Sequence, residues 1–322
     1  MKNILVSGAC ALMGYGILKS LRMSNRNYNL IGTTIYDYDD SVAPKYCDTV
    51  LKAPLTLSDG FIDWLMNVIR EYEVDLIIPS FEIDVNFWSK KKYLLENSRA
   101  KLVLNNVDLI SLCEDKWKFY EELKVNNCPF VIPSSLSSDF KRLKTQFGLP
   151  LILKPRRGSA SKGIVKVLNE ETFYLHKDEI GEKLMVQPLI GTEEEEYTTG
   201  AFCDGKGGYY AIITLRRKLS AEGYTNKAEV IENTNIQEAV FNICKILKPL
   251  GPTNFQFRLH NNQFQLLEIN PRFSASTSMR SAFGYNDAVM AVDYFLESEA
   301  PEQPIIRKGK AIRYIEEHIY YS

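Results

Sequence analysis

Short apolar runs alternate with amphipathic stretches over roughly the first third of the chain. The pattern predicts strands at 3–7, 30–34, 76–79 and 101–104, and helices at 12–23, 57–72 and 85–97. Apolar strands that alternate with helices of period 3.6 are typical of a parallel sheet covered on both faces. We expect this part of the chain to form one wall of a cleft.

The first turn after the opening strand is rich in small residues. Gly8, Gly14 and Gly16 lie there, but without the spacing of a dinucleotide-binding motif. We interpret them as residues that let a strand and a helix pack closely, and a dinucleotide site is the alternative.

From Cys113 the pattern changes. Asp115 is predicted to open a helix with Lys116 in its first turn, where a cation opposes the helix dipole. Such a lysine favours a role in holding an anion, and an exposed surface lysine is the alternative. Further helices are predicted at 138–147 and 236–247, and strands at 151–154, 164–168, 184–190, 197–202, 209–218 and 312–321.

A basic loop of small residues, Arg156–Gly163, connects two of these strands. Backbone N–H groups of small residues can close around phosphate oxygens, and Lys154 and Lys162 add positive charge. The spacing is not that of a Walker A motif. We predict a phosphate-binding loop that becomes ordered when Mg-ATP binds, and a flexible hairpin tip is the alternative.

Residues 254–274 alternate between apolar and polar positions on both sides of Asn261–Asn262 and predict a β-hairpin. Glu268 and Asn270 are two residues apart and share one face of the returning strand, and Gln256 can lie across from them. Three oxygen ligands on a rigid hairpin suit Mg²⁺, which fills its other positions with water and phosphate. An ordinary amphipathic ribbon with a solvated polar face is the alternative.

Composition narrows the classes of function. The 322 residues are 45% hydrophobic, and 39 Lys and Arg balance 40 Asp and Glu to a charge of −1, so we expect no nucleic-acid surface. No apolar run approaches the ~20 residues of a membrane span, and a strand beginning at Lys2 leaves no room for a signal peptide. Six scattered cysteines without a CxxC pair predict a reduced, cytoplasmic protein. With only three histidines, the chemistry must use lysine, arginine, carboxylates and a metal.

Five stretches together resemble the ATP-grasp superfamily, in particular its branch similar to the carbamoyl-phosphate synthase large subunit. They read DKWKFYEEL, LILKPRRGSASKGI, MVQPLIGTEEEEYTTG, NFQFR and LLEINPRFSAST. The resemblance covers essentially the whole chain and implies a mixed α/β and α+β fold. A Rossmann-like pre-ATP-grasp domain would span 1–112, a small ATP-grasp subdomain with the phosphate loop 113–190, and a large subdomain with the metal hairpin 191–322.

The resemblance also implies a set of site residues. ATP would be bound by Lys116, Lys154, Gly158, Ser159, Ser161, Gly163, Gln187, Pro188, Leu189, Ile190, Glu194 and Glu196. For the acid that binds ribose, Glu196 is the first choice and Glu194 the second. The metal ligands would be Gln256, Glu268 and Asn270, and the catalytic cations Lys154, Lys162 and Arg272. Gln187 and Gln256 stand where the superfamily often has acids, and Gln256 would weaken or reshape the first metal site.

The function implied is an ATP-dependent carboxylate–amine ligase that forms an acyl-phosphate with two Mg²⁺ ions, or Mn²⁺ in their place. A carbamoyl-phosphate-type phosphorylating enzyme and a non-catalytic nucleotide-binding regulator are the alternatives. The partners would be ATP, a small carboxylate and an amine, with an amino acid or sugar acid plausible, and a homodimer is left open. Four arginines could clamp the carboxylate or form surface ion pairs: Arg216, Arg217, Arg258 and Arg280.

Overall fold

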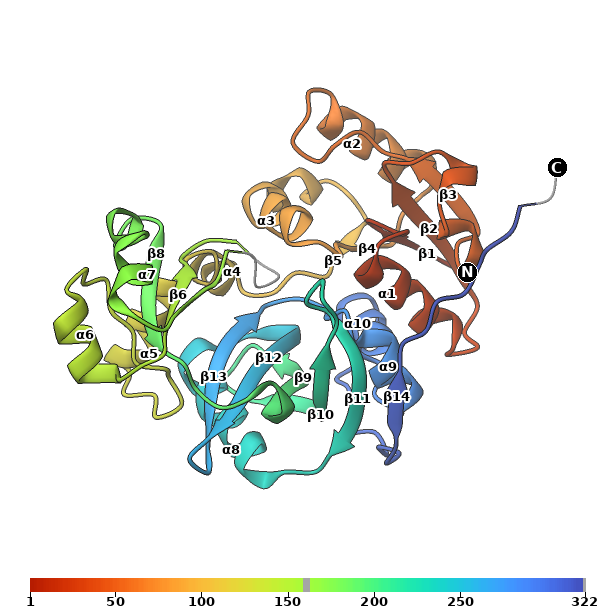
Figure 1. Ribbon diagram of the computed structural model, residues 1–322. Helices are drawn as coiled ribbons and strands as arrows, with labels where there is room; N and C mark the ends of the chain where they lie inside the picture. Colours follow the sequence, from red (N-terminus) through yellow and green to blue (C-terminus); the bar gives the residue numbers. More distant parts are fainter. Residues whose placement is uncertain (159–162, 321–322) are drawn as a thin grey trace.

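The computed structural model describes residues 1–158 and 163–320. Three sheets organise these residues (Figure 1). The first is parallel, with strand order β3-β2-β1-β4-β5, which confirms the predicted parallel sheet. Its elements are β1 (Lys2–Val6), α1 (Leu12–Arg22), β2 (Tyr28–Thr34), β3 (Thr49–Lys52), α2 (Phe61–Glu71), β4 (Leu76–Ile78), α3 (Glu82–Lys91) and β5 (Lys101–Leu102).

Strand β1 shows why the first sheet is covered on both sides. Ile4 and Val6 pack with α1 in one core cluster, whereas Leu5 packs with α2 and α3 in another. Because successive side chains point to opposite faces, a fully apolar strand needs cover on both. The small residues after β1 fit this packing, since a Cβ on Gly14 would lie 2.1 Å from the carbonyl oxygen of Gly8.

The middle of the chain forms a small antiparallel sheet in the order β7-β6-β8. Its strands and the surrounding helices are α4 (Val107–Cys113), α5 (Lys116–Val125), α6 (Phe140–Phe147), β6 (Leu151–Pro155), β7 (Val165–Val167), α7 (Glu170–Tyr174) and β8 (Leu184–Pro188). Helix α4 runs across the predicted boundary between residues 112 and 113, and the predicted domain limits stay a prediction.

The third sheet is antiparallel, in the order β13-β12-β9-β10-β11-β14. Its elements are β9 (Glu196–Asp204), β10 (Tyr209–Leu219), β11 (Thr225–Ile231), α8 (Thr234–Leu247), β12 (Leu250–His260), β13 (Gln263–Asn270), α9 (Thr277–Ala282), α10 (Asp287–Leu296) and β14 (Lys310–Ile312). Helix α8 covers one face of this sheet, and α9 and α10 lie between its other face and α1. One core cluster therefore joins the first sheet to the third.

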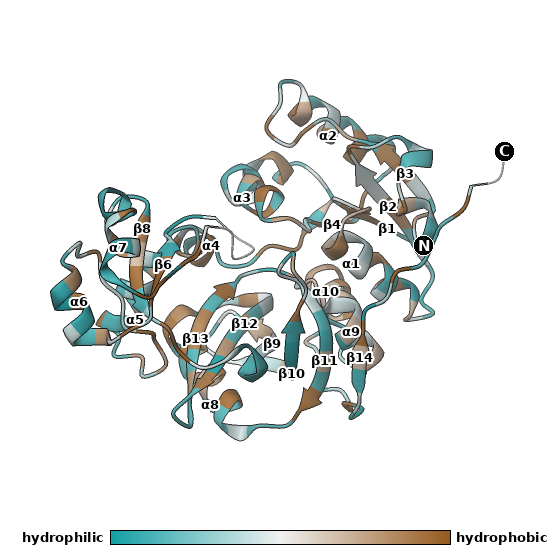
Figure 2. Ribbon diagram, viewed as in Figure 1, coloured by the Kyte–Doolittle hydropathy of each residue, from teal (hydrophilic) through white to brown (hydrophobic). Residues whose placement is uncertain are grey.

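The predicted hairpin is confirmed as β12 and β13. Asn261 and Asn262 form its turn with φ values of 48° and 61°, and β13 ends at Asn270, immediately before Pro271. Hydrophobic and hydrophilic residues alternate along both strands in Figure 2. Gln256 lies opposite Glu268, as expected.

Two other predictions need correction. The expected strand 312–321 is wrong beyond Ile312: only Lys310–Ile312 pairs with β11, and residues 313–320 form no strand. Instead the tail runs back to the first sheet and its helices, here called the first lobe (Figure 1). There the Tyr320 hydroxyl donates to the Ser41 carbonyl oxygen at 2.6 Å. Strands β3 and β11 were not predicted from the sequence. Among the helices within 1–158 and 163–320, none has the length and apolar character needed to cross a membrane.

Candidate functional site

A cavity opens where the three sheets meet. Its walls come from α3 and α4 on one side, from α5, β6 and β8 on another, and from the end of β13. Seven residues of the predicted site line it: Lys116, Lys154, Gly158, Gln187, Glu268, Asn270 and Arg272. The cavity therefore brings together side chains that are more than 150 positions apart in the chain.

Lys154 reaches the cavity because of the alternation of β6. Leu151 and Leu153 enter the core of the small sheet, so Lys154 points to the opposite face. Its Nζ donates to the carbonyl oxygen of Leu267 at 3.2 Å. Leu267 is the extra residue of a β-bulge in the hairpin. Burial lowers the pKa of Lys154, and the neighbouring carboxylate of Glu268 partly opposes that shift.

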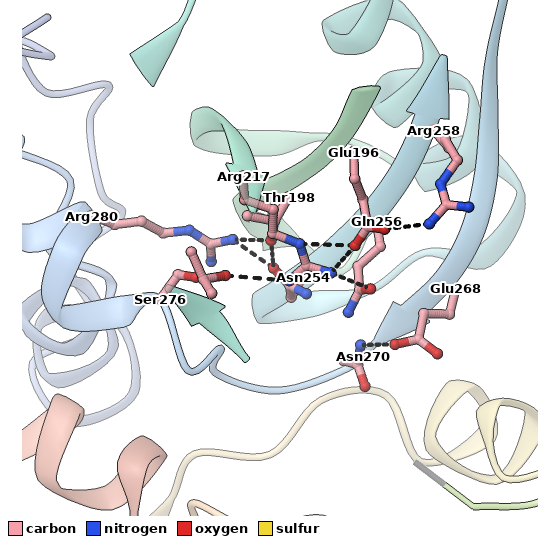
Figure 3. Close-up of polar contacts among 11 residues, drawn as sticks. Glu196, Thr198, Arg217, Asn254, Gln256, Arg258, Glu268, Asn270, Ser276 and Arg280 are labelled. Atoms are coloured by element: carbon pink, nitrogen blue, oxygen red, sulfur yellow. Dashed lines mark hydrogen bonds and ion pairs between the residues drawn. The ribbon is translucent and has the colours of Figure 1, made fainter. Parts of the chain in front are cut away.

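Glu268 and Asn270 lie side by side on the face of β13 that lines the cavity. The Asn270 amide donates to Glu268 Oε1 at 3.1 Å (Figure 3). Burial raises the pKa of Glu268, but the charge of Lys154, this hydrogen bond and the charge of Lys116 lower it by more, so the net shift is downward. Glu268 is therefore an ionised carboxylate facing cations.

These donors fit a magnesium ion. No cluster of three or more His, Cys, Asp or Glu side chains gathers among residues 1–158 and 163–320, so the ion would rest on one carboxylate and on amide oxygens. Mg²⁺ is commonly held by one or two carboxylates together with substrate phosphates and water. Asn270 Oδ1 also accepts a hydrogen bond from Arg272 at 3.1 Å.

Asp115 ties helix α5 to the start of the phosphate loop. Its carboxylate caps the helix by accepting from the backbone N–H of Trp117 at 2.9 Å, and it accepts from Arg156 at 2.7 Å and Arg157 at 3.1 Å. Lys116 then donates from Nζ to the carbonyl oxygen of Gly158 at 2.5 Å. The two predicted phosphate cations, Lys116 and Lys154, thus both border the cavity next to the loop.

Four predicted loop residues lie outside the described part of the chain or away from the cavity lining. Ser159, Ser161 and Lys162 fall in the stretch that the structure does not describe. Gly163 begins the return to β7 with φ of 75°, a conformation that glycine adopts without strain.

The predicted adenine-binding segment lies only partly at the cavity. Gln187 lines it and donates to the Ser134 hydroxyl at 2.9 Å. Pro188, Leu189 and Ile190 follow directly in the chain but are not among the residues that line this cavity.

The carboxylate of Glu196 accepts hydrogen bonds from two arginines. Its Oε1 accepts from Arg217 at 2.7 Å and its Oε2 from Arg258 at 2.6 Å, and the residue is only 4% exposed. Both oxygens are engaged by guanidinium groups, and Glu196 does not line the cavity. Glu194, the second choice for that role, is exposed on a single turn of helix at Glu193–Glu195.

The four arginines considered for a substrate clamp do not line the cavity. Arg216 pairs with Glu229 on the surface at 2.8 Å, and Arg217 and Arg258 hold Glu196. Arg280 is 1% exposed and donates to Asn254 Oδ1 at 2.5 Å (Figure 3). Each of these arginines already has polar partners away from the cavity, either in the interior or on the surface.

Sequence reasoning missed the polar residues that the first lobe contributes. Glu82 and Asn86 of α3 and Glu114 after α4 line the cavity, and Glu82 lies 3.8 Å from Arg272. A signal was available: Glu82 follows β4 at its carboxyl end, where open parallel sheets bind ligands.

Comparisons with known proteins agree with this geometry. A family model described as ATP-grasp in the biosynthetic pathway with Ter operon matches residues 181–318. The carbamoyl phosphate synthase large chain of Thermotoga sp. strain RQ2 is 23% identical over 300 residues, covering 87% of this chain and 25% of that protein. The chain thus spans about a quarter of the length of this relative.

Two solved structures share the fold. N5-carboxyaminoimidazole synthetase from Staphylococcus aureus, complexed with ADP, has a TM-score of 0.70 at 19% identity, covering 95% of this chain and 80% of that one. L-amino acid ligase from Bacillus licheniformis has a TM-score of 0.67 at 14% identity, covering 92% and 74%. The order of the sheets, the composition of the cavity and these likenesses agree: the chain has the ATP-grasp fold, and its residues 181–318 match an ATP-grasp family.

Proposed function

We propose that this protein is an ATP-dependent ligase that joins a carboxylate to an amine through an acyl-phosphate. The observation that carries the proposal is the convergence of three cations, Lys116, Lys154 and Arg272, on the Glu268–Asn270 pair in one cavity. Phosphoryl transfer requires positioning and charge neutralisation more than it requires a protein nucleophile. A site with those groups and few histidines suits that chemistry.

The cationic and the oxygen-bearing residues of the cavity would bind different parts of the ligand. Lys116, Lys154 and the basic loop would hold the phosphates, while Glu268 and Asn270 would hold Mg²⁺, or Mn²⁺, which suits the same oxygens. When bound, the ion would supply positive charge that neutralises the phosphates. Gln187 and the segment after it would contact the adenine. Of the two candidates for binding ribose we favour Glu194, because both oxygens of Glu196 are engaged.

The reaction would proceed in two displacements. A substrate carboxylate oxygen attacks the γ-phosphorus, which forms an acyl-phosphate and releases ADP. The amine nitrogen then attacks the acyl carbon, forms the C–N bond, loses a proton and expels phosphate. Arg272 borders both the phosphate-binding end and the first lobe, so its guanidinium would neutralise the acyl-phosphate while the amine approaches.

The test is a screen for ADP release over carboxylates crossed with amines, including amino acids and sugar acids. We expect one pair to give ADP release that needs both partners and Mg²⁺. Lys154→Met should abolish it, because the buried cation beside Glu268 is lost, whereas Lys141→Met on the exposed face of α6 should not. Nucleotide binding without turnover on any pair would instead favour the non-catalytic regulator, and turnover with the carboxylate alone would favour the phosphorylating enzyme.

A further inference from the structure

Arg217 links three neighbouring strands beside the metal-binding face of the hairpin. It stands on β10 directly across from Glu196 on β9, and Arg258 on β12 faces Glu196 from the other side. Two guanidinium groups against one carboxylate leave this cluster with a net charge of +1. The cluster lies on the same face of the sheet as Gln256, beside the Glu268–Asn270 pair (Figure 3).

One nitrogen of Arg217 serves two acceptors. Nη2 donates to Glu196 Oε1 at 2.7 Å and to Gln256 Oε1 at 2.7 Å, and Nε adds a second bond to Glu196 at 3.1 Å. The Arg217 side chain is only 7% exposed. Nη1 also donates to the Thr225 hydroxyl at 3.4 Å, so three side chains hold the enclosed guanidinium against Gln256.

The amide oxygen of Gln256 is therefore already paired with a cation. A divalent ion bound to that oxygen would lie next to the guanidinium, in surroundings where charges are poorly screened. Gln256 also supplies no negative charge to offset the repulsion. Asn270 Oδ1 also accepts from a guanidinium, that of Arg272 at 3.1 Å, but the Asn270 amide donates to the adjacent carboxylate of Glu268, whose charge offsets that of the arginine.

We propose that Arg217 takes the place of a second divalent ion, so that the loaded site holds a single metal, on Glu268 and Asn270. The inference rests on the proposed function, since it concerns the metal that accompanies the nucleotide. Arg217 acts here as a positioning residue: it fixes Gln256 as its hydrogen-bond acceptor and excludes a metal from that oxygen. Arg217 itself does not line the cavity.

The test counts metal ions in the complex without relying on turnover. Protein and a non-hydrolysable ATP analogue are mixed in equal amounts and titrated with Mn²⁺, and bound ions are counted by electron paramagnetic resonance. Wild type should bind one ion per protein–nucleotide complex and give the spectrum of an isolated Mn²⁺. Two ions with a spin-coupled spectrum in the wild type would overturn the inference.

Variants separate the charge of Arg217 from the ligand at 256. Gln256→Glu alone should still bind one ion, because the new carboxylate would pair with Arg217. Arg217→Gln combined with Gln256→Glu should bind two, and a count of one in the folded double variant would also contradict the inference. Arg216→Gln is the matched control, since the adjacent residue pairs with Glu229 on the surface, and it should bind one ion.

The experiment distinguishes a failure of the proposed function from a failure of this inference. Nucleotide binding is measured in the same samples, and a wild type that binds no nucleotide would overturn both the proposed function and this inference. Nucleotide binding with two coupled ions would overturn only the inference. If the double variant does not fold by circular dichroism, the wild-type and Gln256→Glu counts still decide the question.

Discussion

Glu268 is the residue on which the charge balance of the cavity depends, because it is an ionised carboxylate among Lys154, Lys116 and Arg272. Glu268→Gln keeps the shape but removes the charge that a divalent ion would meet. We predict at least ~100-fold slower ADP formation, or ~2.7 kcal/mol of barrier, with an unchanged melting transition. Kinetic assays and calorimetry check this. Glu297→Gln, at a surface pair with Lys2, is the control, and near-normal turnover in Glu268→Gln would remove the residue from the site.

A second carboxyl group affects stability rather than chemistry. Asp287 is 2% exposed, and burial raises its pKa from 3.8 to about 6, against the opposing charge of Arg280. A raised pKa means that the folded protein binds the proton more tightly than the unfolded chain. This contribution to stability is present below about pH 4 and is lost as the pH rises to about 6, for a total of about 3 kcal/mol.

Asp287→Asn removes that titration. We predict that the free energy of unfolding of the variant, minus that of wild type, increases between about pH 4 and pH 6 and is level above that range. Urea unfolding at a series of pH values measures the difference, which cancels the titration of other carboxylates. A difference that does not change with pH would mean that folding does not shift the pKa of Asp287.

At the scale of elements, the Asp115 cap couples a helix to a loop. Asp115→Asn keeps an oxygen for the Trp117 N–H but loses the ion pairs with Arg156 and Arg157, whereas Asp115→Ala loses the cap as well. We predict a loss of ~1–3 kcal/mol for the asparagine variant and ~1 kcal/mol more for alanine. Urea unfolding checks the order. Equal stability of the two variants would show that the cap contributes nothing.

The same coupling predicts an effect on pH dependence. Burial raises the pKa of Asp115, but Arg156 and the N–H of Trp117 lower it by more, so the net pKa is below its usual value. The stability that Asp115 contributes is therefore present above the pKa of the unfolded chain and is lost as the pH falls through the lower folded value.

The hairpin shows what alternation can and cannot predict. Its turn and the shared face of Glu268 and Asn270 follow from a period of two. The bulge at Leu267 also interrupts the alternation of apolar residues. Leu266 and Ile269 are both buried, although they are an odd number of positions apart. That change of parity marks the bulge at which the Leu267 carbonyl oxygen accepts from Lys154.

Strand β11 could not be recognised in the same way. Its sequence, TNKAEVI, is mostly polar and contains residues that favour helices. It forms a strand because β10 and β14 flank it with backbone partners, and only Thr225, Ala228 and Val230 are buried. Tertiary pairing, and not local preference, decides its conformation.

At the scale of the whole molecule, the site exists only where three sheets meet. Local patterns predicted Lys116, Lys154 and Glu268 separately, and the resemblance to a known family grouped them and added Gln187. Neither predicted that Glu82 of α3 would pair with Arg272 or that Asn86 would line the same cavity, because both depend on how the first lobe packs against the third sheet. The shared core formed by α1, α9 and α10 fixes that packing.

The shared core also implies that the cavity is a property of the assembled chain. Ser281 of α9 donates to the Ser20 hydroxyl of α1 at 2.8 Å, and the amide of Asn286 donates to the Ser20 carbonyl oxygen at 2.8 Å. These contacts hold the first lobe against the helices of the large sheet, and so hold α3 at the wall of the cavity.

The measurement that tests the central claim most directly follows the carboxylate oxygens. With the pair of substrates identified by the screen, the carboxylate is labelled with oxygen-18 and the released phosphate is analysed by mass spectrometry. An acyl-phosphate path transfers a labelled oxygen from each carboxylate to the phosphate, so we predict singly labelled phosphate in step with ADP and product. Unlabelled phosphate at the same rate would mean that water or another group attacks the nucleotide, and would contradict the account.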